Sequence, residues 1–288
     1  MQLKEKFKAG EFTVLAEMEP PKGVDVSAMV GHAKRVKGDV DAFVVPEMSN
    51  AVMRMSSLGG AAIMQSHGME TVMQVNCRDR NRIALQADLL AAYGCGIINI
   101  MGVSGEDPSL GDHHQTKAVH DIDLMTLFGA VAKLQAGKDL AGNDIEGAPS
   151  FLVGAAVNAR ATGDELEKEL ALMAEKEAAG VDFFIAPPVF DVGAMAAFLE
   201  KVDLKKTRVL PTVMLLKSVG MARYLDRHLN LTISQELIKR MMRAPDKPTE
   251  SLAIASEIIE ALKEAGFAGV VISAMGWEDK LPKLMDML

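Results

Sequence analysis

Residues 71–101, TVMQVNCRDRNRIALQADLLAAYGCGIINIM, contain the repeating unit that decides the fold. An apolar run over 71–76 precedes a polar turn, a segment of helical period over 81–93, and a second apolar run over 96–101. Short β-branched runs bounded by turn residues are typical of buried parallel strands. The stretch therefore predicts a strand–helix–strand unit. Its periodicity places one set of apolar residues mostly on one helix face: Ile83, Leu85, Leu89, Leu90 and Tyr93.

The same unit recurs along the whole chain. Eight apolar runs in 288 residues give about 36 residues per unit, the size of a βα repeat. The runs cover 13–17, 41–45, 71–76, 96–101, 151–156, 181–185, 208–213 and 269–273, and helical periods also mark 164–179 and 249–265. Eight consecutive βα units predict an α/β fold, a (β/α)8 TIM barrel, with residues 1–288 as a single domain. A doubly wound open sheet is the alternative, weakened because no Gly-x-Gly-x-x-Gly follows the first strand.

Composition restricts the class of protein. Hydrophobic residues make up 49% and charged residues 24%, which excludes disordered and disulfide-stapled chains. A net charge of −8 argues against general binding of nucleic acid or of a membrane surface. No apolar run approaches the ~18 residues of a membrane span, and the start lacks a signal-peptide pattern. With two cysteines, Cys77 and Cys95, too few for a disulfide framework, we expect a cytoplasmic protein.

A barrel of this kind carries its chemistry at the C-terminal ends of the strands. Glu17 ends the first apolar run on the same face as Leu15, and Glu19 follows on that face about 7 Å further along. If that face points into the barrel, burial and the neighbouring carboxylate raise the pKa of Glu17, which suits a general acid. The alternative is that both carboxylates point to water at the strand end.

Three arginines, Arg78, Arg80 and Arg82, lie within five residues of the turn after the third run. Together with the N-terminus of the following helix they predict a site for phosphate or carboxylate. The alternative is a capping turn, with Asp79 or Asn81 closing the helix. The two interpretations are compatible.

Residues 102–120 form a long stretch without a helical or strand pattern, which in a compact domain is usually functional. We expect a lid that carries a carboxylate. A metal cluster is the less favoured alternative, because Asp112, His113, His114 and His120 lack an ordered ligand spacing. A solvated loop is the third. We therefore expect no metal.

Four segments taken in order resemble the methylenetetrahydrofolate reductase family: 16–21, 76–81, 102–108 and 176–191. The similarity extends over roughly residues 12–275. It implies a (β/α)8 barrel that binds FAD and reduces 5,10-methylenetetrahydrofolate to the 5-methyl form by hydride transfer, in one-carbon metabolism and methionine biosynthesis. The electron donor implied is NADH or NADPH, or a reduced iron–sulfur partner subunit.

The resemblance also implies roles for individual residues. Glu17 matches the catalytic acid, and Glu106, or Asp107 if the loop shifts, matches a carboxylate near flavin and pterin. Glu169 and Lys176 match FAD contacts, although their spacing of seven on a helix alone favours a surface ion pair. The other implied FAD contacts are Gln74, Asn76, Arg78, Asp79, Arg80, Ser104, Gly105, Asp107, Ala156 and Arg160, and the implied substrate contacts are Glu19, Pro187 and Phe190.

One departure concerns the substrate. The Thr-Gln of the family after the sixth strand reads Ala186-Pro187 here, so pterin recognition must differ. The expected partners are a methylene-tetrahydrofolate-type molecule and either further copies of the chain or an electron-transfer subunit. Two other classes stay open: a pterin-dependent methyltransferase without flavin, and a partner-dependent non-catalytic subunit of a larger redox complex.

Overall fold

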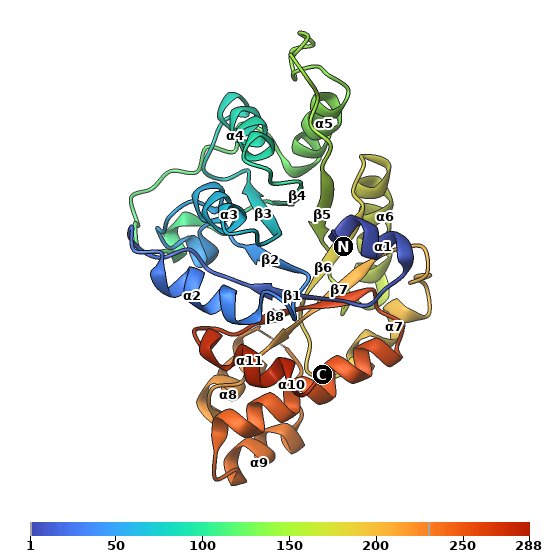
Figure 1. Ribbon diagram of the computed structural model, residues 1–288. Coiled ribbons are helices and arrows are strands. Elements are labelled where there is room, and N and C mark those ends of the chain that lie inside the picture. Colours follow the sequence, from blue (N-terminus) through green and yellow to red (C-terminus); the bar gives the residue numbers. More distant parts are fainter. Residues whose placement is uncertain (1, 230) are drawn as a thin grey trace.

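Eight parallel strands form a closed barrel in the computed structural model, which describes residues 2–229 and 231–288 (Figure 1). Each strand pairs with its neighbours in chain order, and β8 closes the barrel against β1. The strands are β1 (Thr13–Glu17), β2 (Ala42–Val45), β3 (Thr71–Asn76), β4 (Asn99–Val103), β5 (Leu152–Ala156), β6 (Phe183–Pro188), β7 (Val209–Met214) and β8 (Gly269–Ser273). The predicted TIM barrel is confirmed.

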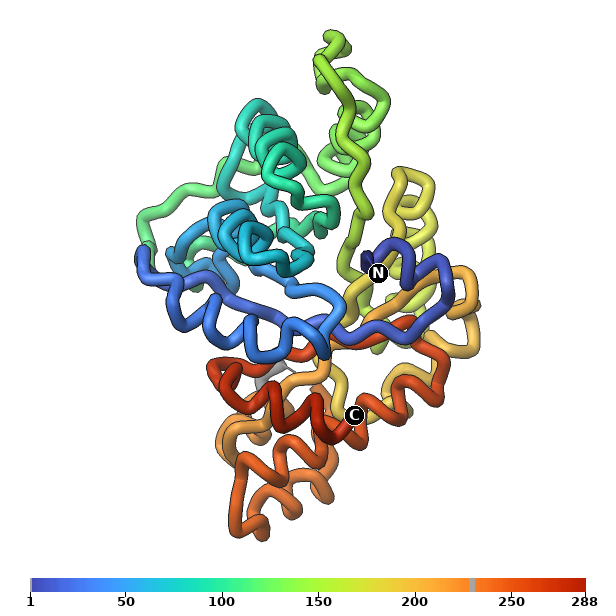
Figure 2. The backbone as a smooth tube through the Cα atoms, in the orientation of Figure 1, coloured from blue at the N-terminus to red at the C-terminus, as the bar shows by residue number. Residues whose placement is uncertain are grey.

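Helices surround the barrel, as the tube in Figure 2 shows. They are α1 (Leu3–Ala9), α2 (Ser27–Val36), α3 (Ser57–Ser66), α4 (Arg82–Gly94), α5 (Leu124–Gln135), α6 (Gly163–Ala178), α7 (Ala196–Leu199), α8 (Val219–Leu229), α9 (Gln235–Arg243), α10 (Lys247–Glu264) and α11 (Leu281–Met285). Short 3₁₀ turns are η1 (Ser49–Ala51), η2 (Pro108–Leu110), η3 (Val192–Met195) and η4 (Glu278–Lys280). Within the described ranges, no helix is both long and apolar enough to cross a bilayer.

Strand alternation separates two hydrophobic cores. One lies between strands and helices, and the other fills the barrel interior with residues such as Leu15, Val72 and Val271. Helix α1 closes the N-terminal end of the interior, where the Phe7 ring lies 5.5 Å from that of Phe183. A Cβ at position 154 would lie 2.4 Å from the Phe183 ring, so this strand position requires glycine.

The structure corrects three details of the prediction. Strand β4 starts later than expected, at Asn99, and β6 extends to Pro188. The buried residues of α4 are Leu85, Leu89 and Ala92, so the prediction that one face holds most of the set Ile83, Leu85, Leu89, Leu90 and Tyr93 is wrong. Ile83 and Leu90, two turns apart on the opposite side, are 75% and 40% exposed. The predicted apolar face of α10 is confirmed.

Candidate active site

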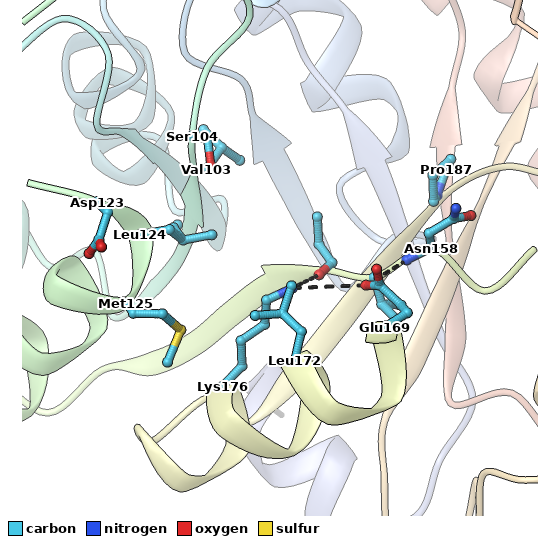
Figure 3. Close-up of a pocket in the computed structure, with 13 residues that line it drawn as sticks. Val103, Ser104, Asp123, Leu124, Met125, Asn158, Glu169, Leu172, Lys176 and Pro187 are labelled. Carbon is cyan, nitrogen blue, oxygen red and sulfur yellow. Dashed lines mark hydrogen bonds and ion pairs between the residues drawn. The ribbon is translucent and has the colours of Figure 1, made fainter. Parts of the chain in front are cut away.

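A cavity of about 600 Å³ opens at the C-terminal ends of β4 and β5, between these strands and helices α5 and α6 (Figure 3). Its volume lies within the usual range for small-molecule sites. Its walls are largely apolar, with a few polar groups between them. The lining residues are Gly102, Val103, Ser104, Asp123, Leu124, Met125, Ala156, Val157, Asn158, Glu169, Leu172, Lys176 and Pro187.

Lys176 and Glu169 form the polar wall that α6 contributes to the cavity (Figure 3). The Lys176 side chain is 5% exposed, and its Nζ donates a 2.7 Å hydrogen bond to the carbonyl of Ala156. Nζ lies 4.0 Å from Glu169 Oε1, which also accepts the backbone N–H of Asn158 at 3.1 Å. Burial lowers the pKa of Lys176. The pair is therefore part of the cavity wall and not a surface ion pair.

Glu17 lies at the end of β1 and continues the interior face that Leu15 begins. Its Oε1 accepts a hydrogen bond from Ser273 Oγ at 3.2 Å. Burial raises the pKa of Glu17 to about 7; the Ser273 hydrogen bond opposes this shift, whereas the carboxylates of Glu19 and Glu278 add to it. The predicted direction is confirmed, and the carboxyl can hold a proton near neutral pH. Glu19 lies further out, 2.9 Å from Arg54 Nε, and burial also raises its pKa.

A buried carboxylate that the sequence analysis missed, Glu47, connects two of the predicted residues. Its backbone N–H donates to Gln74 Oε1 at 3.3 Å, and its Oε1 accepts from Arg80 Nη1 at 2.8 Å. Gln74 lies two residues after Val72 on the interior face of β3. Glu47 also caps the start of α3 by accepting the N–H of Ser57. Nothing in the local pattern around Glu47 signals this role.

The three arginines of the 78–82 turn do not combine into one unpaired anion site. Arg78 Nε lies 2.7 Å from Asp79, Arg80 contacts Glu47 and Asp88 at 2.8 Å each, and Arg82 contacts Asp121 at 2.8 Å. The guanidinium groups are neutralised by carboxylates from four segments of the chain. The capping interpretation is confirmed, because Asn81 Oδ1 accepts the N–H groups of Ile83 and Ala84.

Arg78 fixes the base of the loop between β4 and α5. The residue is 2% exposed, and its Nη1 donates to the carbonyl of Glu106 at 3.1 Å. Its own N–H donates to Asn76 Oδ1 at 2.7 Å, and its carbonyl accepts from Val119. Gly105 packs against this group at φ +83°, where a Cβ would lie 2.4 Å from Asn76 Oδ1. Arg78 and Asp79 also line a smaller cavity of about 160 Å³.

The tip of the same loop is attached to two other loops through one carboxylate. The Asp112 carboxylate accepts hydrogen bonds from Lys22 Nζ and from the N–H of Met53, the latter at 3.0 Å. It also contacts His113 Nδ1 at 2.8 Å. These contacts hold the pKa of Asp112 well below its usual range. The loop therefore crosses from β4 to the β1–α2 and β2–α3 connections. In residues 2–229 and 231–288, no group of three or more His, Cys, Asp or Glu side chains could hold a metal ion.

The cavity includes only part of the predicted set. Ser104, Ala156, Glu169, Lys176 and Pro187 line it. Phe190, 4% exposed, belongs to the outer core, and Asp107 is exposed and caps η2. Other predicted contacts outside its lining are Gln74, Asn76, Arg78, Asp79, Arg80, Gly105, Glu106 and Arg160. The lining also contains residues that sequence analysis missed. Asp123, Leu124 and Met125 lie at the start of α5, which carries no motif, and Leu172 lies on α6, where helical period alone does not show which face borders a cavity.

Fold and site together define a (β/α)8 barrel with a buried carboxyl group, Glu17, at the C-terminal end of β1, and an apolar, lysine-bearing cavity at the C-terminal ends of β4 and β5. Similar solved structures share this fold. An EDTA monooxygenase from Chelativorans sp. BNC1 matches with a TM-score of 0.55 and 13% identity, over 96% of this chain and 92% of that chain. A phosphoenolpyruvate phosphomutase from Streptomyces platensis subsp. rosaceus matches with a TM-score of 0.56 and 17% identity, over 99% and 84%.

The comparison of sequences goes further than the fold. The model of the methylenetetrahydrofolate reductase family matches residues 2–288, nearly the whole chain. The chain belongs to this family. No curated protein matches it.

Proposed function

We propose that this chain is an FAD-dependent reductase that converts 5,10-methylenetetrahydrofolate, or a related methylene-pterin, to the 5-methyl form. The observation that carries the proposal is Glu17, a carboxylic acid with a pKa of about 7 at the mouth of the barrel. An acid that is protonated near neutral pH can donate a proton during reduction. Family membership supports the reaction class, and NADH or NADPH is the proposed electron donor.

The cavity walls fit a large, flat, anionic cofactor. Ala156 exposes a small side chain at the end of a buried strand, which leaves room for an aromatic ring system. Leu124, Met125 and Leu172 offer apolar surface. Lys176 is the buried cation among these residues, and Asn158 adds a polar side chain. These residues would hold FAD, which when bound supplies the hydride.

The role of the protein is then to place a proton and exclude water. Glu17 donates its proton to the methylene-bridged substrate, which opens one carbon–nitrogen bond and leaves an iminium carbon that accepts the hydride. The Ser273 hydroxyl stabilises the resulting Glu17 carboxylate by hydrogen bonding. The loop that Asp112 attaches lies beside this face and limits the access of water.

Half-reactions test this proposal. Purified protein is expected to show flavin absorbance, directly or after incubation with FAD, and NADH is expected to bleach it without oxygen. Glu17→Gln should leave this bleaching unchanged and slow reoxidation by methylene-tetrahydrofolate by about 10²–10⁴-fold, the usual contribution of a general acid. Protein that cannot be reconstituted with FAD would sink the reductase proposal. If Glu17→Gln reoxidises at the normal rate, Glu17 is not the acid.

A second candidate is a pterin-dependent methyltransferase without flavin. Pro187 favours it, because this cavity residue offers no side-chain hydrogen bond where the resemblance implies an amide. Colourless protein that binds methyl-tetrahydrofolate and transfers its methyl group would support this candidate. Colourless protein without either activity would instead indicate a partner-dependent subunit.

A further inference from the structure

Glu17 is closed off on the inner side of the barrel. The interior residues below it are apolar, among them Leu15 and Val271, and such side chains have no group that exchanges a proton. On the side of β8, the Ser273 hydroxyl donates a hydrogen bond to Glu17 Oε1. An acid that gives up a proton in each catalytic cycle must take up another one from solvent. Glu17 therefore needs a polar route that leads outward, a requirement that rests on the proposed function.

Glu19 is the next side chain on the inner face of this segment. The strand pattern continues past the end of β1, because the N–H of Met18 donates to the carbonyl of Val44 at 2.8 Å and the side chains of Ala16 and Met18 both pack in the outer core. Alternation then places Glu17 and Glu19 together on the inner face, about 7 Å apart along the strand. The Glu19 side chain is 36% exposed, whereas Glu17 lies deeper. Glu19 thus lies between Glu17 and water.

Arg54 holds the carboxyl group of Glu19 in place. Its Nε lies 2.9 Å from Glu19 Oε1, and its Nη1 donates to the carbonyl of Pro20 at 3.5 Å. Burial raises the pKa of Glu19, and the positive charge of Arg54 opposes this shift. Because the two influences oppose each other, both the neutral and the ionised form of Glu19 are accessible. A residue that passes a proton on must be able to adopt both forms.

A third carboxylate, that of Glu278 in η4, acts on the same two residues. Its charge raises the pKa of both Glu17 and Glu19. Its Oε1 accepts the N–H of Gly276 at 2.8 Å, in a turn where Gly276 has a φ of +85°. This hydrogen bond favours the ionised form and ties the side chain to its own loop. Glu278 therefore shares the electrostatic environment of Glu19 but not its place beside Glu17 on the strand face.

We propose that Glu19 supplies the proton that replaces the one Glu17 gives up in each cycle. The neutral Glu19 carboxyl transfers its proton to the Glu17 carboxylate, directly or through one water molecule. Glu19 is left as a carboxylate, pairs with Arg54, and takes a proton from solvent. One proton enters from solvent for each proton that Glu17 donates, and no electrons move. The transfer runs inward because deeper burial makes Glu17 the stronger proton acceptor of the two.

Proton exchange at Glu17 can be followed without flavin or pterin. After a pH jump across the pKa of Glu17, the infrared C=O band of its protonated carboxyl decays, and Glu17→Gln identifies this band by lacking it. Glu19→Gln should slow the decay by about 10-fold or more, since a positioned carboxyl no longer carries the proton. Added imidazole should restore the rate in proportion to its concentration, which it would not do for a purely structural defect. Glu19→Asp keeps the carboxyl and should retain most of the rate.

Glu278→Gln is the matched control. Like Glu19→Gln, it removes a negative charge that raises the pKa of Glu17, so both variants should lower this pKa. Only Glu19→Gln should slow the exchange. In steady-state pterin reduction, imidazole should likewise accelerate Glu19→Gln and leave the rate of the wild type unchanged. Circular dichroism checks the fold of each variant.

Three results would overturn this role of Glu19. They are a wild-type exchange rate in Glu19→Gln, equal slowing in Glu278→Gln, and slowing that imidazole does not relieve. Because the exchange is measured without substrate, failure of the proposed function gives a different result. A chain in which Glu19→Gln slows the exchange as expected, but which does not reduce methylene-tetrahydrofolate, would contradict the reductase proposal and leave the proton transfer between Glu19 and Glu17 established.

Discussion

Ser273 Oγ lies 3.2 Å from Glu17 Oε1, across the seam where β8 closes the barrel against β1. The two residues are 256 positions apart, and parallel pairing in register brings them together at the C-terminal ends of their strands. Strand alternation turns both toward the barrel interior. The hydroxyl thus adjusts the acidity of the carboxylic acid that the proposed reaction uses.

Removing this hydroxyl should make Glu17 a weaker acid. The hydrogen bond favours the carboxylate, so Ser273→Ala is expected to raise the pKa of Glu17 above its value of about 7. Because the protonated form donates the proton, the rate of pterin reduction should persist to higher pH than in the wild type. Stopped-flow reoxidation of reduced flavin across pH measures this. Ser273→Thr keeps the hydroxyl and is the control. If the rate of Ser273→Ala falls at the same alkaline pH as the rate of the wild type, the Ser273 hydroxyl does not set the pKa of Glu17.

The raised pKa also predicts a pH dependence of stability. The pKa of Glu17 is about 7 in the folded chain against 4.5 for the ordinary group, so the folded state binds the proton more tightly. Stability that Glu17 contributes is therefore present at low pH and is lost as the pH rises toward 7. Glu17→Gln cannot ionise. Its free energy of unfolding relative to that of the wild type should therefore increase by about 1–3 kcal/mol as the pH rises from 5 to 8. Urea unfolding of both proteins at pH 5 and at pH 8 measures this. A difference between variant and wild type that is the same at both pH values would contradict the prediction.

The local sequence pattern is sufficient to predict the barrel and the strand face on which Glu17 lies. The spacing of the apolar runs reflects the βα repeat itself, and the alternation in β1 determines which side chains share a face with Leu15. Both properties depend on neighbours within one strand or one repeat. They are therefore readable from a single sequence.

Partners from distant segments could not be read in this way. The charges of Arg80 and Arg82 are neutralised by Glu47, Asp88 and Asp121, and only the tertiary fold brings Glu47 and Asp121 within reach of them. The spacing of Glu169 and Lys176 showed that they share a helix face but not which face is covered. In α4 the same ambiguity led to the wrong face for Ile83 and Leu90. Helical period identifies stripes, whereas burial depends on the neighbouring elements.

Lys176 should matter for cofactor binding more than for folding. Lys176→Met keeps most of the apolar stem but removes the partner of the Ala156 carbonyl and of Glu169, so the fold should survive with reduced stability, which circular dichroism checks. If Nζ binds an anionic cofactor, its loss should raise the dissociation constant of FAD by about 10-fold or more, as expected for a hydrogen bond to a charged group. Fluorescence titration with FAD measures this. Lys168→Met, exposed on the same helix, is the matched control. If both variants bind FAD with the same affinity, Lys176 does not contact the cofactor.

Asp112 should control the outer half of the β4–α5 loop and leave its base in place. The carboxylate joins the loop tip to Lys22 and Met53, whereas the base is held separately, where the N–H of Val119 donates to the Arg78 carbonyl at 2.7 Å. Asp112→Ala is therefore expected to speed hydrogen exchange at Met53 by on the order of tenfold, and to leave exchange at Val119 close to the wild-type rate. Asp144→Ala removes a similar but isolated surface pair with Lys138 and is the control. Exchange that increases equally at Met53 and Val119 would mean that the loop opens as one unit, and unchanged exchange at Met53 would mean that Asp112 does not hold it.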